Sequence, residues 1–417
     1  MIELKNRISG LALSCRIPST FIAGDYDRKV NIMKGKMDIV YRSREGVEKA
    51  YSPSRYMNLF EPEEAEKVKD FHRSFSEYEE TPLIKLKGLA EFYGIGDIYI
   101  KDESKRFGLN AFKALGGSYC IGKYMQDHEA GAKQLTFVTA TDGNHGRGIA
   151  WTARKLGQRC VVYMPKGSAE ERLENIKKLG AEAYITDMNY DDAVRHAKKM
   201  ADEKGWIMVQ DTAWEGYEQI PSYIMQGYMT MASEAVSQLK EDVPTHVFLQ
   251  AGVGAMSGAV TAFLRNFYRG ICRPEIIIVE PDKADCIYRT ALAKDGRLRF
   301  VKGDMDTIMA GLACGEPCTI GWDILDREAD AFISMTDNIA ARGMRILANP
   351  VGEDRRVVSG ESGAAAMGAI SFILEDQELR QRLKINEQSK ILCFSTEGDT
   401  DRENYRRIVW DGAYPSF

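Results

Sequence analysis

A regular alternation of short apolar runs with amphipathic segments is the feature that most constrains the fold of this chain. Four runs of strand length, among them "LTFVTAT" and "IMVQD", start at residues 135, 160, 182 and 207, so their starts lie 25, 22 and 25 residues apart. Each gap contains a segment of helical periodicity, for example "DDAVRHAKKMADEKG". Such spacing is typical of right-handed strand–helix–strand units with parallel strands.

A second series of apolar runs follows in the C-terminal half. "HVFLQAG", "IIIVEP", "AFISM" and "KILCFSTEG" start at residues 246, 276, 331 and 390, and a run at residue 97, "DIYIKDE", precedes both series. These runs are continuously apolar, which indicates parallel strands buried on both faces. The sequence therefore predicts an α/β protein of two lobes, with parallel-type sheets flanked by helices and a ligand cleft between the lobes. The N-terminal stretch of about 78 residues is polar and predicts irregular structure.

Charge and residue usage exclude several classes of protein. The 56 basic and 61 acidic residues are interspersed and give a net charge of −5, so we expect no nucleic-acid partner. The apolar runs are far shorter than the roughly 18 residues of a membrane span, and the charged start "MIELKNRISG" is unlike a signal peptide. We therefore expect a cytoplasmic protein with no membrane partner. The histidine and cysteine spacings predict no metal site and reduced thiols.

Small, polar turns follow three of the predicted strands, where open α/β sheets bind ligands. In "AGVGAMSGAV", Gly252, Gly254 and Gly258 precede a helical pattern, and converging backbone N–H groups at such a helix start can hold a phosphate. The turns "TDGNHGRG" and "STEGDTD" follow two other strands. Their oxygen-bearing side chains could equally be helix caps.

Lys113, in "NAFKALGG", stands among unusually apolar and small neighbours. Phe112, Ala114 and Leu115 predict a desolvated environment, which lowers the pKa of an amine and makes it available as a nucleophile. The alternative is a lysine whose stem is buried while its ammonium group stays in water.

Taken together, the lysine, the "GNHG" turn, the glycine loop and the "STEGDTD" turn resemble the fold-type II (tryptophan synthase β-like) enzymes that use pyridoxal 5′-phosphate. "TPLIKL" at residue 81 is similar to the start of their catalytic core. Within these enzymes, longer blocks resemble the diaminopropionate ammonia-lyases. The blocks are "KDESKRFGLNAFKALGG", "TDGNHGRG", "YMPKGSAEER", "VQDTAWEGY", "EPDKADCIYR", "MAGLACGEP" and "SGESGA".

The resemblance implies a domain organisation. Residues 79–113 and 213–417 would form a large cofactor-binding domain, and residues 114–212 a small mobile domain, with the cofactor in the cleft between them. Residues 1–78 would be an N-terminal extension that packs on the core or on a partner subunit, and the family leads us to expect a homodimer.

The resemblance also implies roles for individual residues. Lys113 would form a Schiff base with the cofactor, Asn144 would bind the ring hydroxyl, and Ser395, or alternatively Thr396, would meet the pyridine nitrogen. The phosphate would be held by a loop of five residues: Gly252, Val253, Gly254, Ala255 and Met256.

The same resemblance places two aspartates, Asp142 and Asp211, in the active site with a small amino-acid substrate. An extra carboxylate suits a substrate with a second ammonium, as in 2,3-diaminopropionate. In an α,β-elimination to pyruvate and two ammonia, Lys113 would take the α-proton of the L-isomer and Asp142 that of the D-isomer. The substrate-binding residues would be Asp142, Gly143, Asn144, His145 and Asp211.

Three alternatives remain at this stage. A serine or threonine dehydratase of the same fold would have no need of Asp142. A β-replacement transferase would share the "STEGDTD" type of turn. A non-catalytic cofactor-binding protein would have no need of Lys113.

Overall fold

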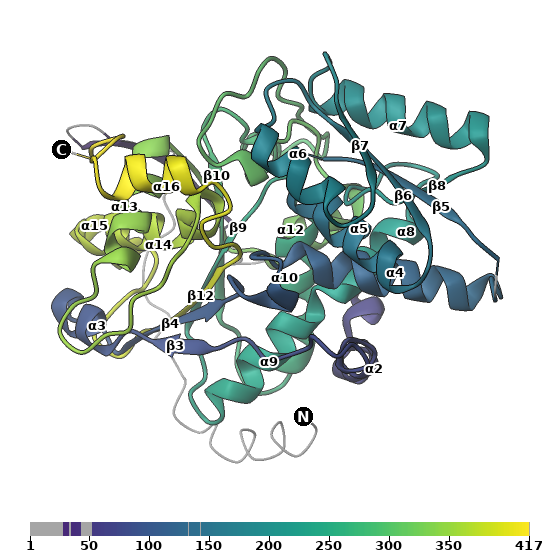
Figure 1. The fold of residues 1–417 in the computed structure, drawn as a ribbon. Helices are drawn as coiled ribbons and strands as arrows, with labels where there is room; N and C mark the ends of the chain where they lie inside the picture. The colour runs from purple at the N-terminus through teal and green to yellow at the C-terminus, as the bar shows by residue number, and fades with distance from the viewer. Residues whose placement is uncertain (1–27, 33–34, 43–51, 132, 142, 417) are drawn as a thin grey trace.

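The structure is a computed structural model that describes residues 28–32, 35–42, 52–131, 133–141 and 143–416. Two sheets are covered by helices (Figure 1), one of eight strands in the order β1-β2-β11-β10-β9-β12-β4-β3 and one of four in the order β7-β6-β5-β8. The larger sheet consists of β1 (Arg28–Ile32), β2 (Gly35–Tyr41), β3 (Leu83–Lys85), β4 (Asp97–Asp102), β9 (His246–Gln250), β10 (Glu275–Pro281), β11 (Ala331–Met335) and β12 (Lys390–Ser395). The smaller sheet consists of β5 (Thr136–Ala140), β6 (Arg159–Met164), β7 (Glu182–Ile185) and β8 (Ile207–Met208).

The helices lie between these strands in the chain, except α16, which follows the last of them. They are α2 (Pro62–Arg73), α3 (Lys87–Tyr93), α4 (Lys113–Asp127), α5 (Asn144–Lys155), α6 (Glu170–Lys177), α7 (Tyr190–Lys204), α8 (Gln219–Gly227), α9 (Met229–Leu239), α10 (Ala255–Phe267), α11 (Cys286–Ala293), α12 (Thr319–Glu328), α13 (Asp337–Ala348), α14 (Glu361–Leu374), α15 (Gln377–Arg382) and α16 (Arg402–Val409), with short 3-10 turns η2 (Met57–Phe60), η3 (Arg106–Gly108) and η4 (Ala310–Leu312). Among the helices of the described ranges, none is long and apolar enough to cross a membrane.

The strands predicted from the apolar runs are all present, and the α/β class is confirmed. Neighbouring strands from β11 through β10, β9 and β12 to β4 are parallel, as are all neighbours in the smaller sheet. β10 shows why its run is continuously apolar: Ile276 and Ile278 pack into one hydrophobic cluster, and Ile277 and Val279 into a second. Successive side chains point to opposite faces, so a sheet with two covered faces buries every residue.

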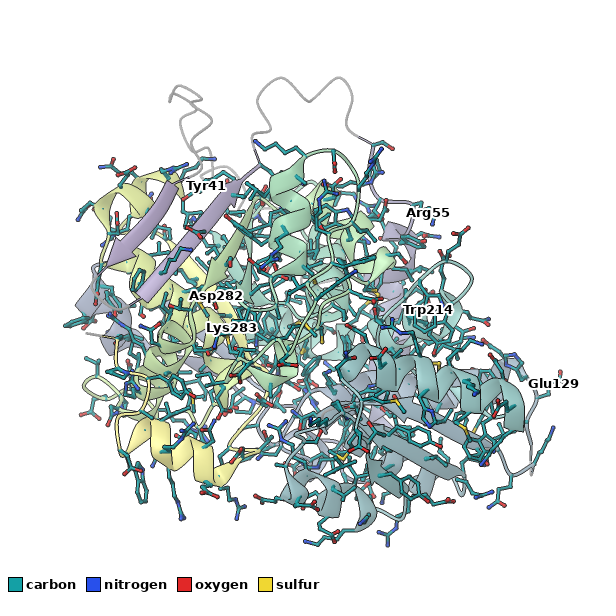
Figure 2. The ribbon with its side chains drawn as sticks, turned by 90° about the horizontal axis from the view of Figure 1, so that it is seen from above. Tyr41, Arg55, Glu129, Trp214, Asp282 and Lys283 are labelled. Carbon is teal, nitrogen blue, oxygen red and sulfur yellow. The ribbon has the colours of Figure 1, made fainter. Side chains whose placement is uncertain are left out.

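The N-terminal stretch differs from its predicted irregular structure. β1 and β2 pair antiparallel, and β2 continues the larger sheet by pairing antiparallel with β11, near Tyr41 in Figure 2. Met37 and Ile39 are buried, but this short alternation within a polar segment is a weak signal by itself. The smaller sheet falls within residues 136–208, inside the range 114–212 expected for a small domain. The division into moving domains stays a prediction.

The Gly-Gly step after Lys113 lets α4 pack closely against two other helices. A Cβ atom on Gly116 would lie 2.6 Å from the Tyr228 side chain, and one on Gly117 would lie 2.9 Å from Ile149. A larger residue at Gly116 would also meet the Ile224 backbone oxygen at 2.9 Å and would push α4 away from α8, whereas one at Gly117 would first displace the Ile149 side chain. The small residues therefore determine where the helix carrying Lys113 lies.

A fully buried cluster of charges holds the segment between β4 and Lys113. The Arg106 guanidinium donates hydrogen bonds to Glu103 at 2.8 and 2.9 Å and to Glu234 of α9 at 2.7 and 2.9 Å. Lys101 Nζ lies 2.7 Å from Glu234, and these side chains are 0% exposed. Burial alone would raise the pKa of Glu234, but Arg106 and Lys101 hold it below its usual range. The cluster thus contains only paired charges.

Replacing Arg106 by leucine is expected to lower the free energy of unfolding by about 3–5 kcal/mol, because buried Glu103 would lose its ion-pair partner and buried Glu234 one of its two. Urea unfolding followed by circular dichroism measures this loss. Arg73→Leu is the matched control, because Arg73 pairs with Asp70 on the surface and its removal should change stability by about 0–1 kcal/mol. Equal losses in the two variants would contradict the importance of the buried cluster.

Candidate active site

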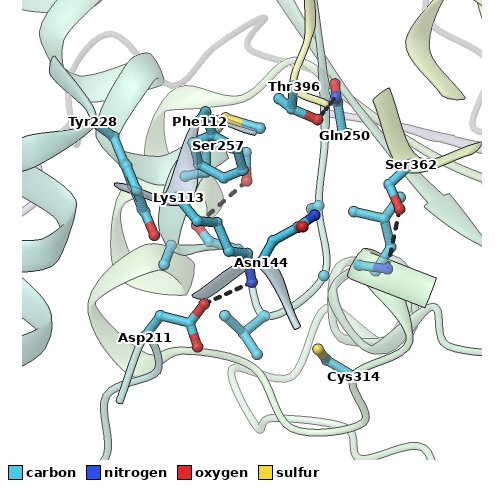
Figure 3. A pocket seen from close by; sticks show the side chains of 18 of the residues that line it. Phe112, Lys113, Asn144, Asp211, Tyr228, Gln250, Ser257, Cys314, Ser362 and Thr396 are labelled. Carbon is cyan, nitrogen blue, oxygen red and sulfur yellow. Dashed lines mark hydrogen bonds and ion pairs between the residues drawn. The ribbon is translucent and has the colours of Figure 1, made fainter. Parts of the chain in front are cut away.

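A pocket lies where two adjacent parallel strands of the larger sheet, β9 and β12, end (Figure 3). Since parallel strands end at the same edge of the sheet, the segments that follow them lie close together. Residues from α4, α5 and the segment after β8 close the pocket from the smaller sheet's side. The lining residues are Phe112, Lys113, Asn144, Asp211, Tyr228, Gln250, Ala251, Gly252, Val253, Gly254, Ala255, Met256, Ser257, Gly311, Leu312, Cys314, Ser362, Thr396 and Glu397.

The turn after β9 makes one wall of the pocket suitable for an anion. Gly254 immediately precedes α10 and has φ = 90°, a conformation that favours glycine. Within the described chain, no side chain caps the start of this helix. The backbone N–H groups of a helix's first turn have no acceptor inside the helix, and the helix dipole adds positive potential there. This wall therefore fits a phosphate group.

Lys113 and Asp211 form an ion pair inside the pocket. Lys113 is the first residue of α4, and its Nζ lies 2.8 Å from Asp211 Oδ2, with the side chains 17% and 8% exposed. His145 lies behind the pair, with Nδ1 3.9 Å from Asp211 Oδ2 and Nε2 2.9 Å from the Val209 carbonyl oxygen. Burial alone would raise the pKa of Asp211, but Lys113 and then His145 hold it well below its usual range. Asp211 is therefore a carboxylate at neutral pH.

Two polar side chains at the ends of β9 and β12 face the pocket together. Gln250 Nε2 donates to Thr396 Oγ1 at 2.8 Å, so the Thr396 hydroxyl proton is available to an acceptor in the pocket. Gln250 Oε1 is buried and accepts no hydrogen bond from the described residues. Ser395 instead hydrogen-bonds the Ser359 hydroxyl at 2.8 Å and does not line the pocket. Because adjacent residues of an extended strand point to opposite sides, only one of the two can face the pocket, and the geometry favours Thr396.

Asn144 connects the pocket wall beside the smaller sheet with the wall beside the larger sheet. It is the first residue of α5, and its Nδ2 donates to Glu397 Oε2 at 2.6 Å. Glu397 also accepts from the backbone N–H of Ser362 at 3.2 Å, and it lies close to Glu361. Burial, and after it the Glu397 carboxylate, raises the pKa of Glu361 to about 7.

The structure brings most of the predicted site residues together. Lys113, Asn144 and Asp211 line the pocket, as does the whole segment from Gly252 to Met256. Gly143, His145 and Ser395 do not line it, whereas Thr396, the residue after Ser395, does. Asp142 lies outside the described residues. The roles expected of all these residues stay predictions.

Other lining residues were not found by sequence reasoning. Gln250 is the last residue of β9 and Glu397 lies in the "STEGDTD" turn after β12, so their position was a usable signal. Tyr228, Gly311, Leu312 and Cys314 come from a helix junction and a long loop. Gly311, Leu312 and Cys314 lie in "MAGLACGEP", a block that carried the family resemblance but gave no position in the fold, and Tyr228 lies in no quoted motif; packing brings all four to the pocket. Among the described residues, no group of three or more acidic, histidine or cysteine side chains could hold a metal ion.

Comparison with known proteins gives matches along most of the chain. The profile of the family described as "Pyridoxal-phosphate dependent enzyme" matches residues 75–397. The chain is 52% identical over 378 residues to the diaminopropionate ammonia-lyase of Escherichia coli (strain K12), covering 85% of this chain and 94% of that relative.

Solved structures agree. The Escherichia coli diaminopropionate ammonia-lyase in complex with an aminoacrylate-PLP azomethine reaction intermediate has a TM-score of 0.83 and 48% identity, covering 91% of this chain and 98% of that one. The complex of that enzyme with D-serine has a TM-score of 0.84 and 46% identity, covering 92% and 100%. These matches confirm the fold-type II architecture expected from the sequence.

The raised pKa of Glu361 predicts a pH-dependent stability. A carboxyl group whose pKa is about 7 in the folded protein and about 4.5 when unfolded contributes stability that is lost as the pH rises through 7. Glu361→Gln removes this titration, so its stability relative to the unaltered protein should increase by about 2 kcal/mol between pH 5 and pH 8. Urea unfolding at both pH values measures the difference. Glu403→Gln, at an exposed position of α16, should show no such change.

Proposed function

Because the chain belongs to the pyridoxal-phosphate dependent enzymes and, within them, to the diaminopropionate ammonia-lyases, we propose that it converts 2,3-diaminopropionate and water to pyruvate and two molecules of ammonia. The single observation in the site that carries this proposal is the ion pair between Lys113 and the buried Asp211 carboxylate. It combines an amine that can attach a cofactor with a carboxylate that stays ionised beside it.

The residues of the pocket fit pyridoxal 5′-phosphate. The uncapped start of α10 would hold its phosphate, and Lys113 would attach it through Nζ. Thr396 would donate its hydroxyl proton to the pyridine nitrogen, and Asn144 would bind the ring hydroxyl. When bound, the cofactor supplies a conjugated ring that withdraws electrons from the α-carbon of the substrate.

The chain's own residues then supply the proton transfers. Lys113 Nζ takes the α-proton of the L-isomer, and the bond from the β-carbon to nitrogen breaks with its electron pair leaving on nitrogen. The Asp211 carboxylate, held ionised by Lys113, binds and orients the side-chain ammonium group of the substrate. Water finally replaces the remaining amino group, which gives pyruvate and the second ammonia.

The ionised state of Asp211 favours an amine over a hydroxyl leaving group. A leaving hydroxyl must be protonated, and a carboxylate with a lowered pKa does not donate a proton at neutral pH. The side-chain ammonium of diaminopropionate already carries its proton and leaves as neutral ammonia. For this reason we favour the ammonia-lyase over a serine or threonine dehydratase.

We propose Asp142 as the base for the D-isomer, on the basis of its place directly before Gly143 and Asn144 in the sequence. A base on the opposite side of the substrate from Lys113 is needed to remove the proton from the mirror-image α-carbon. The complex of D-serine with the Escherichia coli relative is in keeping with a site that admits D-amino acids. We further propose that the protein is a cytoplasmic homodimer.

The first test is the reaction itself. Purified protein should absorb visible light through its bound cofactor and release pyruvate from DL-2,3-diaminopropionate at least about 100-fold faster than it releases pyruvate from serine or 2-oxobutyrate from threonine, since a base or leaving-group mismatch costs about that factor. Pyruvate can be followed with lactate dehydrogenase, and ammonia release should be twice the pyruvate. A preference for serine or threonine would establish the dehydratase instead.

Single substitutions distinguish the roles of the two proposed bases, Lys113 and Asp142. Asp142→Asn should lower the rate with the D-isomer by about 100-fold or more and leave the L-isomer within a few-fold, because general-base catalysis contributes about this much. Lys113→Ala should abolish both activities and the visible absorption of the attached cofactor. Measurement of kcat for each pure isomer decides the assignment. Full activity of Asp142→Asn on the D-isomer would contradict it.

A further inference from the structure

A second cavity of about 310 Å³ lies next to the catalytic pocket and shares Val253 with it. One wall is the face of α7 that carries Asp191, Arg195 and Lys198. The opposite wall comes from segments that belong with the larger sheet, including Phe300 and Glu316. The cavity therefore lies between the two parts of the molecule, where Trp214 is labelled in Figure 2.

Acidic and basic side chains both face this cavity, but they are not all paired. Arg195 bridges the cavity walls, with Nη1 3.3 Å from Glu316 Oε1, and also contacts Asp192 at 3.1 Å. Asp191 makes no hydrogen bond with any side chain of the described ranges. Burial, and after it the Glu316 carboxylate, raises the pKa of Asp191 to about 6. A cationic group in the cavity would offset this repulsion between carboxylates.

Two further features favour an ammonium ligand. Thr319 lines the cavity, and its buried Oγ1 has no hydrogen-bond partner within the part of the chain that the structure describes. Trp214 and Phe300 also line the cavity. The Trp214 ring stacks on Tyr217 with 4.3 Å between the ring centroids, and Phe300 is 52% exposed. Aromatic faces and a hydroxyl beside a carboxylate are the groups that hold an alkylammonium.

We propose that this cavity is a second binding site for a small amino acid with an additional side-chain ammonium. The side-chain ammonium is held by Asp191 and Thr319 against the aromatic rings, and the carboxylate faces Lys198 or Arg195. Lys198 can turn toward the ligand because its partner in the structure, Asp202, is an exposed residue of the same helix. That the natural ligand is the substrate of the adjacent pocket rests on the function proposed above.

The test uses the cofactor-loaded protein and 2,4-diaminobutyrate. This amino acid carries the same charges as 2,3-diaminopropionate, but its terminal amine is on the γ-carbon and is not lost by β-elimination. The quenching of tryptophan fluorescence that disappears in Trp214→Phe reports the second cavity, and the visible absorbance of the cofactor reports the catalytic pocket. Because neither signal requires turnover, a lack of lyase activity would count against the proposed function and not against this site.

Asp191→Asn and, separately, Thr319→Val should each raise the fluorescence midpoint, the former by about 10-fold, which is the loss of one charge-assisted hydrogen bond. The absorbance midpoint should stay within about two-fold. Thr319→Val removes only a hydroxyl and preserves the size of the side chain. Glu203→Gln, an exposed carboxylate paired with Lys199 on the same helix, is the matched control and should change neither midpoint.

Two results would overturn the proposal. One is the absence of any saturable, Trp214-dependent change in fluorescence on addition of 2,4-diaminobutyrate. The other is a fluorescence midpoint that stays the same in Asp191→Asn and Thr319→Val as in the unaltered protein.

Discussion

Five neighbouring strands of the larger sheet run parallel, and this one constraint places the active site. The ends of β9 and β12 meet in the middle of the sheet, so the glycine turn after β9 and the polar turn after β12 face each other across one pocket. The same geometry points the start of α10 into that pocket. The segment that leads to Lys113 is tied to the same edge, because Ala111 pairs with Glu397 in the turn after β12.

The buried charges around Arg106 in the core are paired, whereas some polar groups of the pocket have no partner among the described residues. Around Arg106 each buried carboxylate has a counter-ion, and the cluster holds the segment that leads to Lys113. In the pocket, Lys113 has a carboxylate partner, but Gln250 Oε1 accepts no hydrogen bond from the described residues and the start of α10 has no side-chain cap there. Polar groups of this kind are costly when buried, and they mark the surface that a bound cofactor would satisfy.

The sequence was informative where function depends on local pattern. The apolar runs predicted the strands from β4 to β12, and the small residues around Lys113 predicted an unusual lysine. It was misleading at the N-terminus, where β2 is an internal strand of the larger sheet that pairs antiparallel with β1 and with β11. Sequence reasoning also placed Ser395 before Thr396 as the partner of the pyridine nitrogen. Composition does not show which of two adjacent residues faces a pocket.

The sequence by itself determined the α/β class, the position of the glycine turn at Gly252 to Met256, the unusual lysine and the family to which the chain belongs. These features repeat with the period of a strand or helix, or they form contiguous motifs. Only the tertiary structure decided that Asp211 is the partner of Lys113, that Asn144 meets Glu397, and that Thr396 faces the pocket. Those pairings join residues far apart in the chain, and they depend on how helices and sheets pack and on which way a side chain points where its strand ends.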